Sequence, residues 1–184
     1  LTLSFAGQQP PIALPQVPGT RGPVGVDMRG LNQSGFCSYD PGFANTAGCQ
    51  SAISWIDTEN SVLLHRGYPV DQLARQCDFL EVAYIMLNGD APDEASYQTF
   101  RETITRHTLV HEQIARMCSG FRRDSHPMAL MCALVGALAA FYHDVLDVEN
   151  PQHRALAATR LLSKMPTIAA MSYKYTIEQP AAYP

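Results

Sequence analysis

The sequence predicts a mainly α-helical, soluble globular protein with a small β region at its N-terminal end. Apolar residues make up 46% and charged residues 16% of the 184 residues, a normal composition for a chain that buries a core. From Val70 onward the apolar residues recur with the spacing of one helix face. Before Val70, short apolar runs alternate with turn residues, as they do in strands.

The β region is expected over residues 1–42. It contains the β-prone runs 1–5 and 24–28, which prolines and glycines separate. The remaining residues, 43–184, are expected to form the helical portion of a large domain.

A β-hairpin is expected at the start of this helical portion. The β-prone runs 51–56 and 61–65 flank residues 57–60, which are Asp, Thr, Glu and Asn. Polar, turn-forming residues between two such runs favour a hairpin.

Five helices are expected after the hairpin. The first ends at Asn88-Gly89, because the left-handed residue that follows a last helical turn is usually Gly or Asn. The second begins near Pro92, whose missing N–H has no helical partner in a first turn. The expected positions of all five are 79–87, 92–107, 110–121, 127–146 and 151–166.

The third, fourth and fifth helices are predicted from their apolar residues. The third carries Val110, Ile114, Met117 and Phe121 on one face, which is expected to be core. The fourth is apolar almost all round and is therefore expected to be enclosed by other helices. The fifth is expected to end at Pro166, because proline interrupts a helix.

The composition excludes several classes of function. A net charge of −4 and a pI near 5.8 do not fit a general nucleic-acid or anionic-membrane surface. The five cysteines are odd in number and widely spaced, which fits a reducing cytoplasm and neither a disulfide framework nor a metal site. The longest apolar run, 128–142, is shorter than the roughly 20 residues that span a bilayer.

Two groups of cations are candidates for an anion site. His153, Ala157, Arg160 and Lys164 share one helix face, and no acidic residue lies within one turn on that face. Arg106-His107-Thr108 lies at the end of another helix. Each group fits a phosphate site, but each also fits solvated or capping residues that complement a helix dipole. Spacing alone leaves both interpretations open.

Four histidines are considered as general bases. None has a visible orienting partner, and a lone histidine is more often a packed or capping residue. They are His65, His111, His126 and His143.

Five strings occur in the order in which they appear in a known family. They are DPGF at 40–43, LLHRGYP at 63–69, TRHT at 105–108, FRRDSHPM at 121–128 and LLSKMPT at 161–167. Together they resemble the N-terminal half of bacterial, hexameric, NADH-regulated citrate synthases. The resemblance runs from about residue 36 to the end, is weaker before it, and covers somewhat less than half of a family member.

The resemblance implies an α-helical large domain and a small domain, with an active site between them. The implied reaction joins acetyl-CoA and oxaloacetate and releases citrate and CoA, the first step of the tricarboxylic acid cycle. The family's catalytic residues, an aspartate and two histidines, match nothing here and are expected after Pro184. This chain alone is therefore expected to be inactive.

The family's regulatory NADH site, in contrast, maps onto this chain. The resemblance places it at Arg106, His107, Thr108, Tyr142, Arg160 and Lys164. It implies no required cofactor, a cytoplasmic location, and self-association as a homodimer or a hexamer of dimers. Neither nucleic acid nor a membrane is an expected partner.

Two other functions are considered. 2-Methylcitrate synthase carries out the same chemistry with propionyl-CoA, and its selectivity would be set mostly after Pro184. A helical module that senses a nucleotide without catalysis would also explain why no catalytic set is present.

Overall fold

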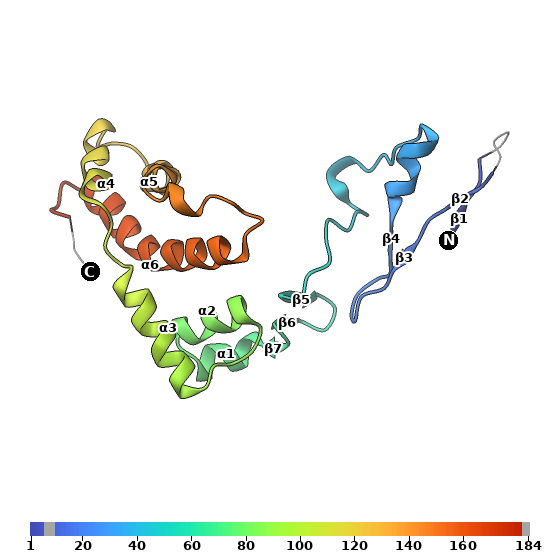
Figure 1. Ribbon diagram of the computed structural model, residues 1–184, viewed down its shortest axis with the longest axis horizontal. Helices are drawn as coiled ribbons and strands as arrows, with labels where there is room; N and C mark the ends of the chain where they lie inside the picture. The colour runs from blue at the N-terminus through green and yellow to red at the C-terminus, as the bar shows by residue number, and fades with distance from the viewer. Residues whose placement is uncertain (6–9, 182–184) are drawn as a thin grey trace. The chain divides into compact units, whose positions relative to one another are not determined.

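The computed structural model describes residues 1–5 and 10–181, and the chain divides into two compact units, residues 1–90 and 91–184. Short strands and short helices make up the first unit, and the second unit is helical and contains the longest helices (Figure 1). This confirms a mainly α-helical fold with a small N-terminal β region. The domain boundary expected between residues 42 and 43 stays a prediction.

The first unit begins with two antiparallel pairs of very short strands. They are β1 (Thr2–Leu3) with β2 (Ile12–Ala13), and β3 (Gln16–Val17) with β4 (Gly25–Val26). The 3₁₀ helix η1 (Met28–Ser34) packs on β2 and buries Leu31. A second, η2 (Pro41–Phe43), follows it.

The predicted hairpin is present. β5 (Ser54–Asp57) pairs with β6 (Val62–His65) in antiparallel register, and the Asp57 carboxylate accepts the backbone N–H groups of Glu59 and Asn60 in the turn. A short third strand, β7 (Tyr68–Pro69), pairs with β6 and was not predicted.

Two helices complete the first unit. The helix α1 (Val70–Gln76) packs on β6 and β7 and buries Leu73. The second, α2 (Phe79–Asn88), ends as predicted at Gly89, which has a φ of 99°. Arg66 donates two hydrogen bonds to the carbonyl of Met86, at 2.9 and 3.1 Å, and so links the hairpin to the negative end of α2.

Four α-helices form the second unit. They are α3 (Glu94–Arg106), α4 (Glu112–Met117), α5 (Pro127–Phe141) and α6 (Pro151–Thr176). Short 3₁₀ turns, η3 (Cys118–Gly120) and η4 (His143–Val145), follow α4 and α5. The helices α3 and α5 both pack against α6.

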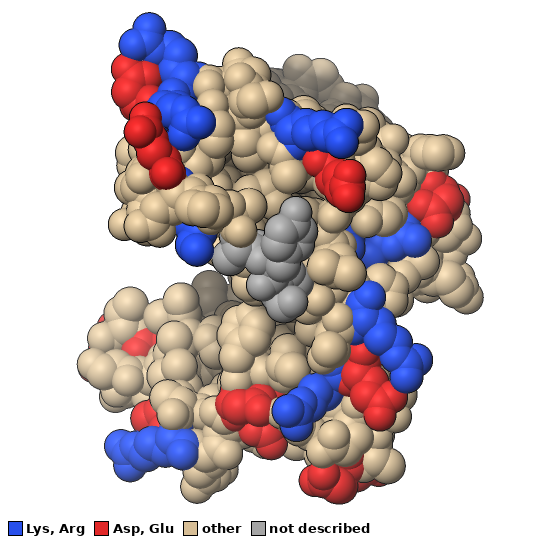
Figure 2. All heavy atoms as spheres, turned by 90° about the vertical axis from the view of Figure 1, so that its left-hand side faces the viewer, with Lys and Arg blue, Asp and Glu red and all other residues tan. Residues whose placement is uncertain are grey.

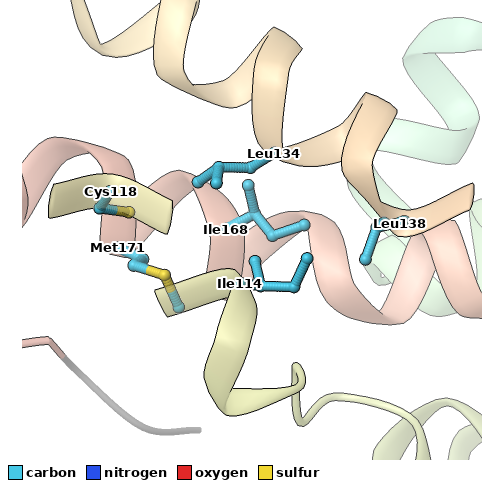
Figure 3. Close-up of a cluster of buried hydrophobic side chains, with 6 residues drawn as sticks. All are labelled: Ile114, Cys118, Leu134, Leu138, Ile168 and Met171. Atoms are coloured by element: carbon cyan, nitrogen blue, oxygen red, sulfur yellow. The ribbon is translucent and has the colours of Figure 1, made fainter. Parts of the chain in front are cut away.

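The core of the second unit lies between α4, α5 and α6 (Figure 3). Leu134 on α5, Ile168 on α6 and Ile114 on α4 are completely buried. The same cluster includes Cys118, Leu138 and Met171. Removing apolar surface from water stabilises a fold by about 25 cal/mol per Å². This cluster is therefore the main stabilising contact of the unit.

The third predicted helix is shorter than expected, and only part of its apolar face is core. Ile114 is buried, but Met117 and Phe121 are 37% and 36% exposed. The α-helix stops at Met117, so Phe121 no longer follows its period, and Cys118 takes the buried position one turn after Ile114.

The predicted ends of the last two helices are wrong. The helix α5 stops at Phe141 rather than Leu146, because Tyr142 leaves the helical backbone conformation (φ −126°, ψ 45°). The helix α6 continues past Pro166 to Thr176. Proline in a helix interior costs about 3 kcal/mol. Burial of Ile168 and Met171 just beyond Pro166 offsets this cost.

Charges of both signs share the surface. Exposed ion pairs one helical turn apart join Asp71 with Arg75, Glu102 with Arg106, and Glu112 with Arg116. On the face drawn in Figure 2, blue cationic side chains accordingly lie beside red acidic ones at several places. Across residues 1–5 and 10–181, no helix combines the length and apolar character needed to cross a membrane.

Substitution of Ile168 by Ala tests the core of the second unit. We expect Ile168→Ala to lower the free energy of unfolding by about 2 to 5 kcal/mol, because it leaves a cavity at a fully buried position. Leu161→Ala, at a 41% exposed position of the same helix, should change it by less than about 1 kcal/mol. Urea denaturation measures both values, and equal losses would contradict this assignment of the core.

Candidate functional site

The six residues predicted to bind a nucleotide all lie in the second unit. Arg106 is the last residue of α3, and His107 and Thr108 follow it. Tyr142 caps the end of α5, and the remaining two, Arg160 and Lys164, lie one turn apart on α6. Hydrogen bonds and ring contacts bring Tyr142, Arg160, Lys164 and the backbone after α3 together.

Lys164 is the most buried of these cations, at 3% exposed. Its Nζ donates to the carbonyl oxygens of His107 and Leu109, each at 2.6 Å. These carbonyls follow the last turn of α3, where the helix dipole places negative partial charge. On the same face of α6, Thr167 donates to the carbonyl of Thr108 at 3.0 Å. Lys164 therefore has a structural role whether or not it also meets an anion.

The ring of Tyr142 lies against both cations of α6. The Arg160 guanidinium carbon is 4.6 Å from the ring centroid, and Lys164 Nζ is 5.2 Å from it. A cation near an aromatic ring is attracted to the negative face of its π system. The ring offsets part of the repulsion between Arg160 and Lys164, which lie one turn apart.

Arg160 forms a two-pronged ion pair with Asp144 of η4. Its Nη1 and Nη2 donate to Oδ1 and Oδ2 of Asp144, at 3.0 and 3.2 Å. The Arg160 side chain is 17% exposed and that of Asp144 is 59% exposed. The bonds from Arg160 hold the pKa of the Asp144 carboxyl below its usual range, so this carboxylate is charged at neutral pH.

This ion pair corrects an argument made from the sequence. The phosphate interpretation assumed that no acidic residue offsets Arg160 and Lys164, which is true along α6 itself. The offsetting carboxylate instead comes from Asp144, 16 positions earlier and on another element. No helical spacing rule connects Asp144 with Arg160, so sequence reasoning missed it.

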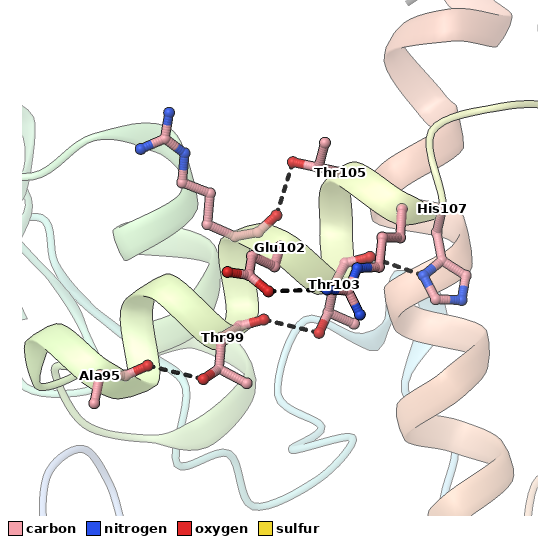
Figure 4. Close-up of polar contacts among 8 residues, drawn as sticks. Ala95, Thr99, Glu102, Thr103, Thr105 and His107 are labelled. Atoms are coloured by element: carbon pink, nitrogen blue, oxygen red, sulfur yellow. Dashed lines mark hydrogen bonds and ion pairs between the residues drawn. The ribbon is translucent and has the colours of Figure 1, made fainter.

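Arg106 and His107 are held by α3 itself (Figure 4). Arg106 donates to Glu102 at 3.0 Å, and both side chains are well exposed. His107 Nδ1 lies 2.8 Å from the carbonyl oxygen of Thr103. A carbonyl only accepts, so Nδ1 carries a proton in this contact.

Two of the histidines considered as general bases are helix caps. The Nδ1 atoms of His111 and His126 accept the N–H groups of Gln113 and Met128, at the starts of α4 and α5. This confirms the capping interpretation for both. Among residues 1–5 and 10–181, no group of three or more His, Cys, Asp or Glu side chains is placed to hold a metal ion.

The arrangement is suited to exchange one anion for another. Arg160 and Arg106 each face a carboxylate that is mostly exposed, Asp144 and Glu102 respectively. Guanidinium groups bind carboxylate and phosphate through the same paired hydrogen bonds, so either anion fits these two side chains. Lys164 contributes its charge from below the surface.

Comparisons with solved structures place the chain in one structural class, the helical fold of citrate synthases. The enzyme from Pyrobaculum aerophilum is 25% identical, with a TM-score of 0.71 over 78% of this chain and 38% of that one. The enzyme from the archaeon Thermoplasma acidophilum, solved with carboxymethyl coenzyme A and oxaloacetate, is 22% identical, with a TM-score of 0.73 over 80% of this chain and 38% of that one. The Thermotoga maritima enzyme is 22% identical, with a TM-score of 0.66 over 80% of this chain and 37% of that one.

The family model described as citrate synthase, C-terminal domain, matches residues 42–184. This chain belongs to the citrate synthase family. It spans little more than a third of the length of the three solved enzymes.

The structural role of Lys164 is testable by substitution with Met, which keeps the side-chain length and removes the charge. We expect Lys164→Met to lower the free energy of unfolding by about 1 to 3 kcal/mol, because two carbonyl groups lose their donor. Lys174→Met on the same helix should cost at most about 1 kcal/mol, the size of a helix-dipole contact. Thermal unfolding measures both values, and an unchanged midpoint for Lys164→Met would contradict the role.

Proposed function

We propose that this chain is the N-terminal part of a citrate synthase, which condenses acetyl-CoA with oxaloacetate. The match of residues 42–184 to the family is the observation that carries this proposal. The Thermoplasma relative was solved with a coenzyme A analogue and oxaloacetate, which supports the same substrates for this protein.

The proposed reaction has three steps. A base removes a proton from the acetyl methyl group. The resulting carbanion attacks the ketone carbon of oxaloacetate and forms a carbon–carbon bond, while the ketone C=O double bond opens and its oxygen takes up a proton. Water then cleaves the thioester and releases citrate and free CoA. By resemblance, the residues that move these protons lie after Pro184. This chain contributes helices of the large domain to the proposed enzyme.

The full-length gene product should release CoA from acetyl-CoA only when oxaloacetate is present. A thiol reagent that reacts with free CoA measures this release. Propionyl-CoA, which carries one extra methylene, is the matched substrate, and we expect a lower kcat/KM for it. A clear preference for propionyl-CoA would replace this proposal with 2-methylcitrate synthase.

The 184-residue chain alone should show no oxaloacetate-dependent CoA release. The expected reason is that a base and its histidine partners must lie within hydrogen-bond reach of the substrate, and the resemblance assigns none of them to this chain. The full-length product is the positive control in the same assay. Activity of the isolated chain would contradict the assignment.

We further propose that NADH inhibits the enzyme at the site formed by Arg106, His107, Thr108, Tyr142, Arg160 and Lys164. The gathering of Lys164, Arg160 and the Tyr142 ring at the backbone that follows α3 supports this site, and Arg106 lies in the last turn of that helix. The bacterial hexameric type, its cytoplasmic location and its assembly as a homodimer or hexamer of dimers belong to the same proposal. Exposed apolar side chains on the helices, such as Met128 and Tyr173, support self-association.

Arg106 gives the cleanest test of NADH binding, because its ion pair is exposed and contributes little to folding. Arg106→Gln should raise the NADH concentration for half-maximal inhibition about five- to tenfold, the effect of losing one exposed hydrogen bond of about 1 to 1.4 kcal/mol. Arg101→Gln, on the same helix and also exposed, should leave this concentration unchanged. Equal inhibition of the two variants would show that the site is misplaced.

A further inference from the structure

The Asp144–Arg160 pair occupies the same groups that a phosphate would use. Both terminal nitrogens of Arg160 already donate to the two oxygens of Asp144. The planar guanidinium binds a carboxylate or a phosphate through this same pair of parallel hydrogen bonds. A phosphate therefore gains the two-pronged contact with Arg160 only after Asp144 has left it.

The position of Asp144 lets its carboxylate separate from Arg160. Its side chain is 59% exposed, so it regains water when it turns away from Arg160. It lies in η4, a 3₁₀ turn of three residues with no buried member. Arg160, in contrast, is mostly buried and remains against the Tyr142 ring at 4.6 Å. The cation is thus the fixed partner and the carboxylate the exchangeable one.

Asp144 also opposes a phosphate through its charge. Its carboxylate lies beside Arg160, where a phosphate would bind, and like charges at close range repel. The second carboxylate near the site, Glu102, makes one exposed hydrogen bond to Arg106 and is a weaker competitor.

We propose that Asp144 is an internal competitor of the regulatory nucleotide, which holds Arg160 while the site is empty and sets the nucleotide concentration needed to fill it. This inference rests on the nucleotide site proposed above and adds a residue that determines its affinity. The apparent dissociation constant equals the intrinsic one divided by the fraction of molecules whose Arg160 is released. Removal of the Asp144 charge raises that fraction.

Asp144→Asn in the full-length protein tests this inference, with Asp147→Asn as the matched control. Both variants remove one negative charge from the same loop, but Asp147 accepts the N–H of Glu149 and does not pair with Arg160. Asp144→Asn should lower the NADH dissociation constant about two- to fivefold, the contribution of a partly exposed ion pair. Asp147→Asn should change it by less than about 1.5-fold, because a more distant exposed charge is screened.

Two further measurements separate this inference from the proposed function. Inorganic pyrophosphate, titrated by calorimetry, reports on an anion at Arg160 without any nucleotide. In an Arg160→Gln background, Asp144→Asn should change the affinity for either ligand by less than it does with Arg160 present, because the competition for the guanidinium is gone and only the charge repulsion remains.

The outcomes are distinct. Tighter binding of both ligands to Asp144→Asn alone supports the competition and the NADH site together. Tighter pyrophosphate binding without NADH binding by any variant supports the competition and overturns the NADH proposal. NADH binding that Asp144→Asn and Asp147→Asn change equally overturns the competition and leaves the NADH site standing. No response of either ligand to Asp144→Asn overturns the inference.

Discussion

The candidate site depends on the hydrogen bonds that the ammonium group of Lys164 donates. This group is buried between α6 and the backbone that leaves α3, and it donates to two carbonyl oxygens there. A buried charge is stable only when its hydrogen bonds are made, so residues 107–109 must follow one path past α6. Thr167 adds a hydrogen bond to the same backbone. The ring of Tyr142 and the guanidinium of Arg160 are then placed on the outer side of this contact.

Each cation of the site has a partner within the protein, and this limits how tightly any anion is held. Lys164 complements the end of α3, Arg160 pairs with Asp144, and Arg106 pairs with Glu102. A ligand gains only the difference between its own hydrogen bonds and those it displaces. An anion at these side chains would therefore be held less tightly than by cations that have no partner in the protein.

Local signals predicted the elements whose ends are marked by single residues. Asn88-Gly89 ends α2, and the turn of the hairpin lies between β5 and β6. The errors came where packing over long distances decides. Pro166 predicts a helix end, and this prediction is wrong because the burial of Ile168 and Met171 beyond it is visible only in three dimensions. In the same way, helix spacing found Arg160 and Lys164, but not the carboxylate and carbonyls that partner them.

Pro166 also determines how α6 is held at its middle. It has no amide hydrogen, so the carbonyl of Leu162, one turn earlier, lacks its usual hydrogen bond within the helix. Lys164 and Thr167 lie on either side of Pro166, and both donate to the backbone that leaves α3. The turn of α6 with the weakest backbone hydrogen bonding is therefore the turn that side chains fasten to the neighbouring segment.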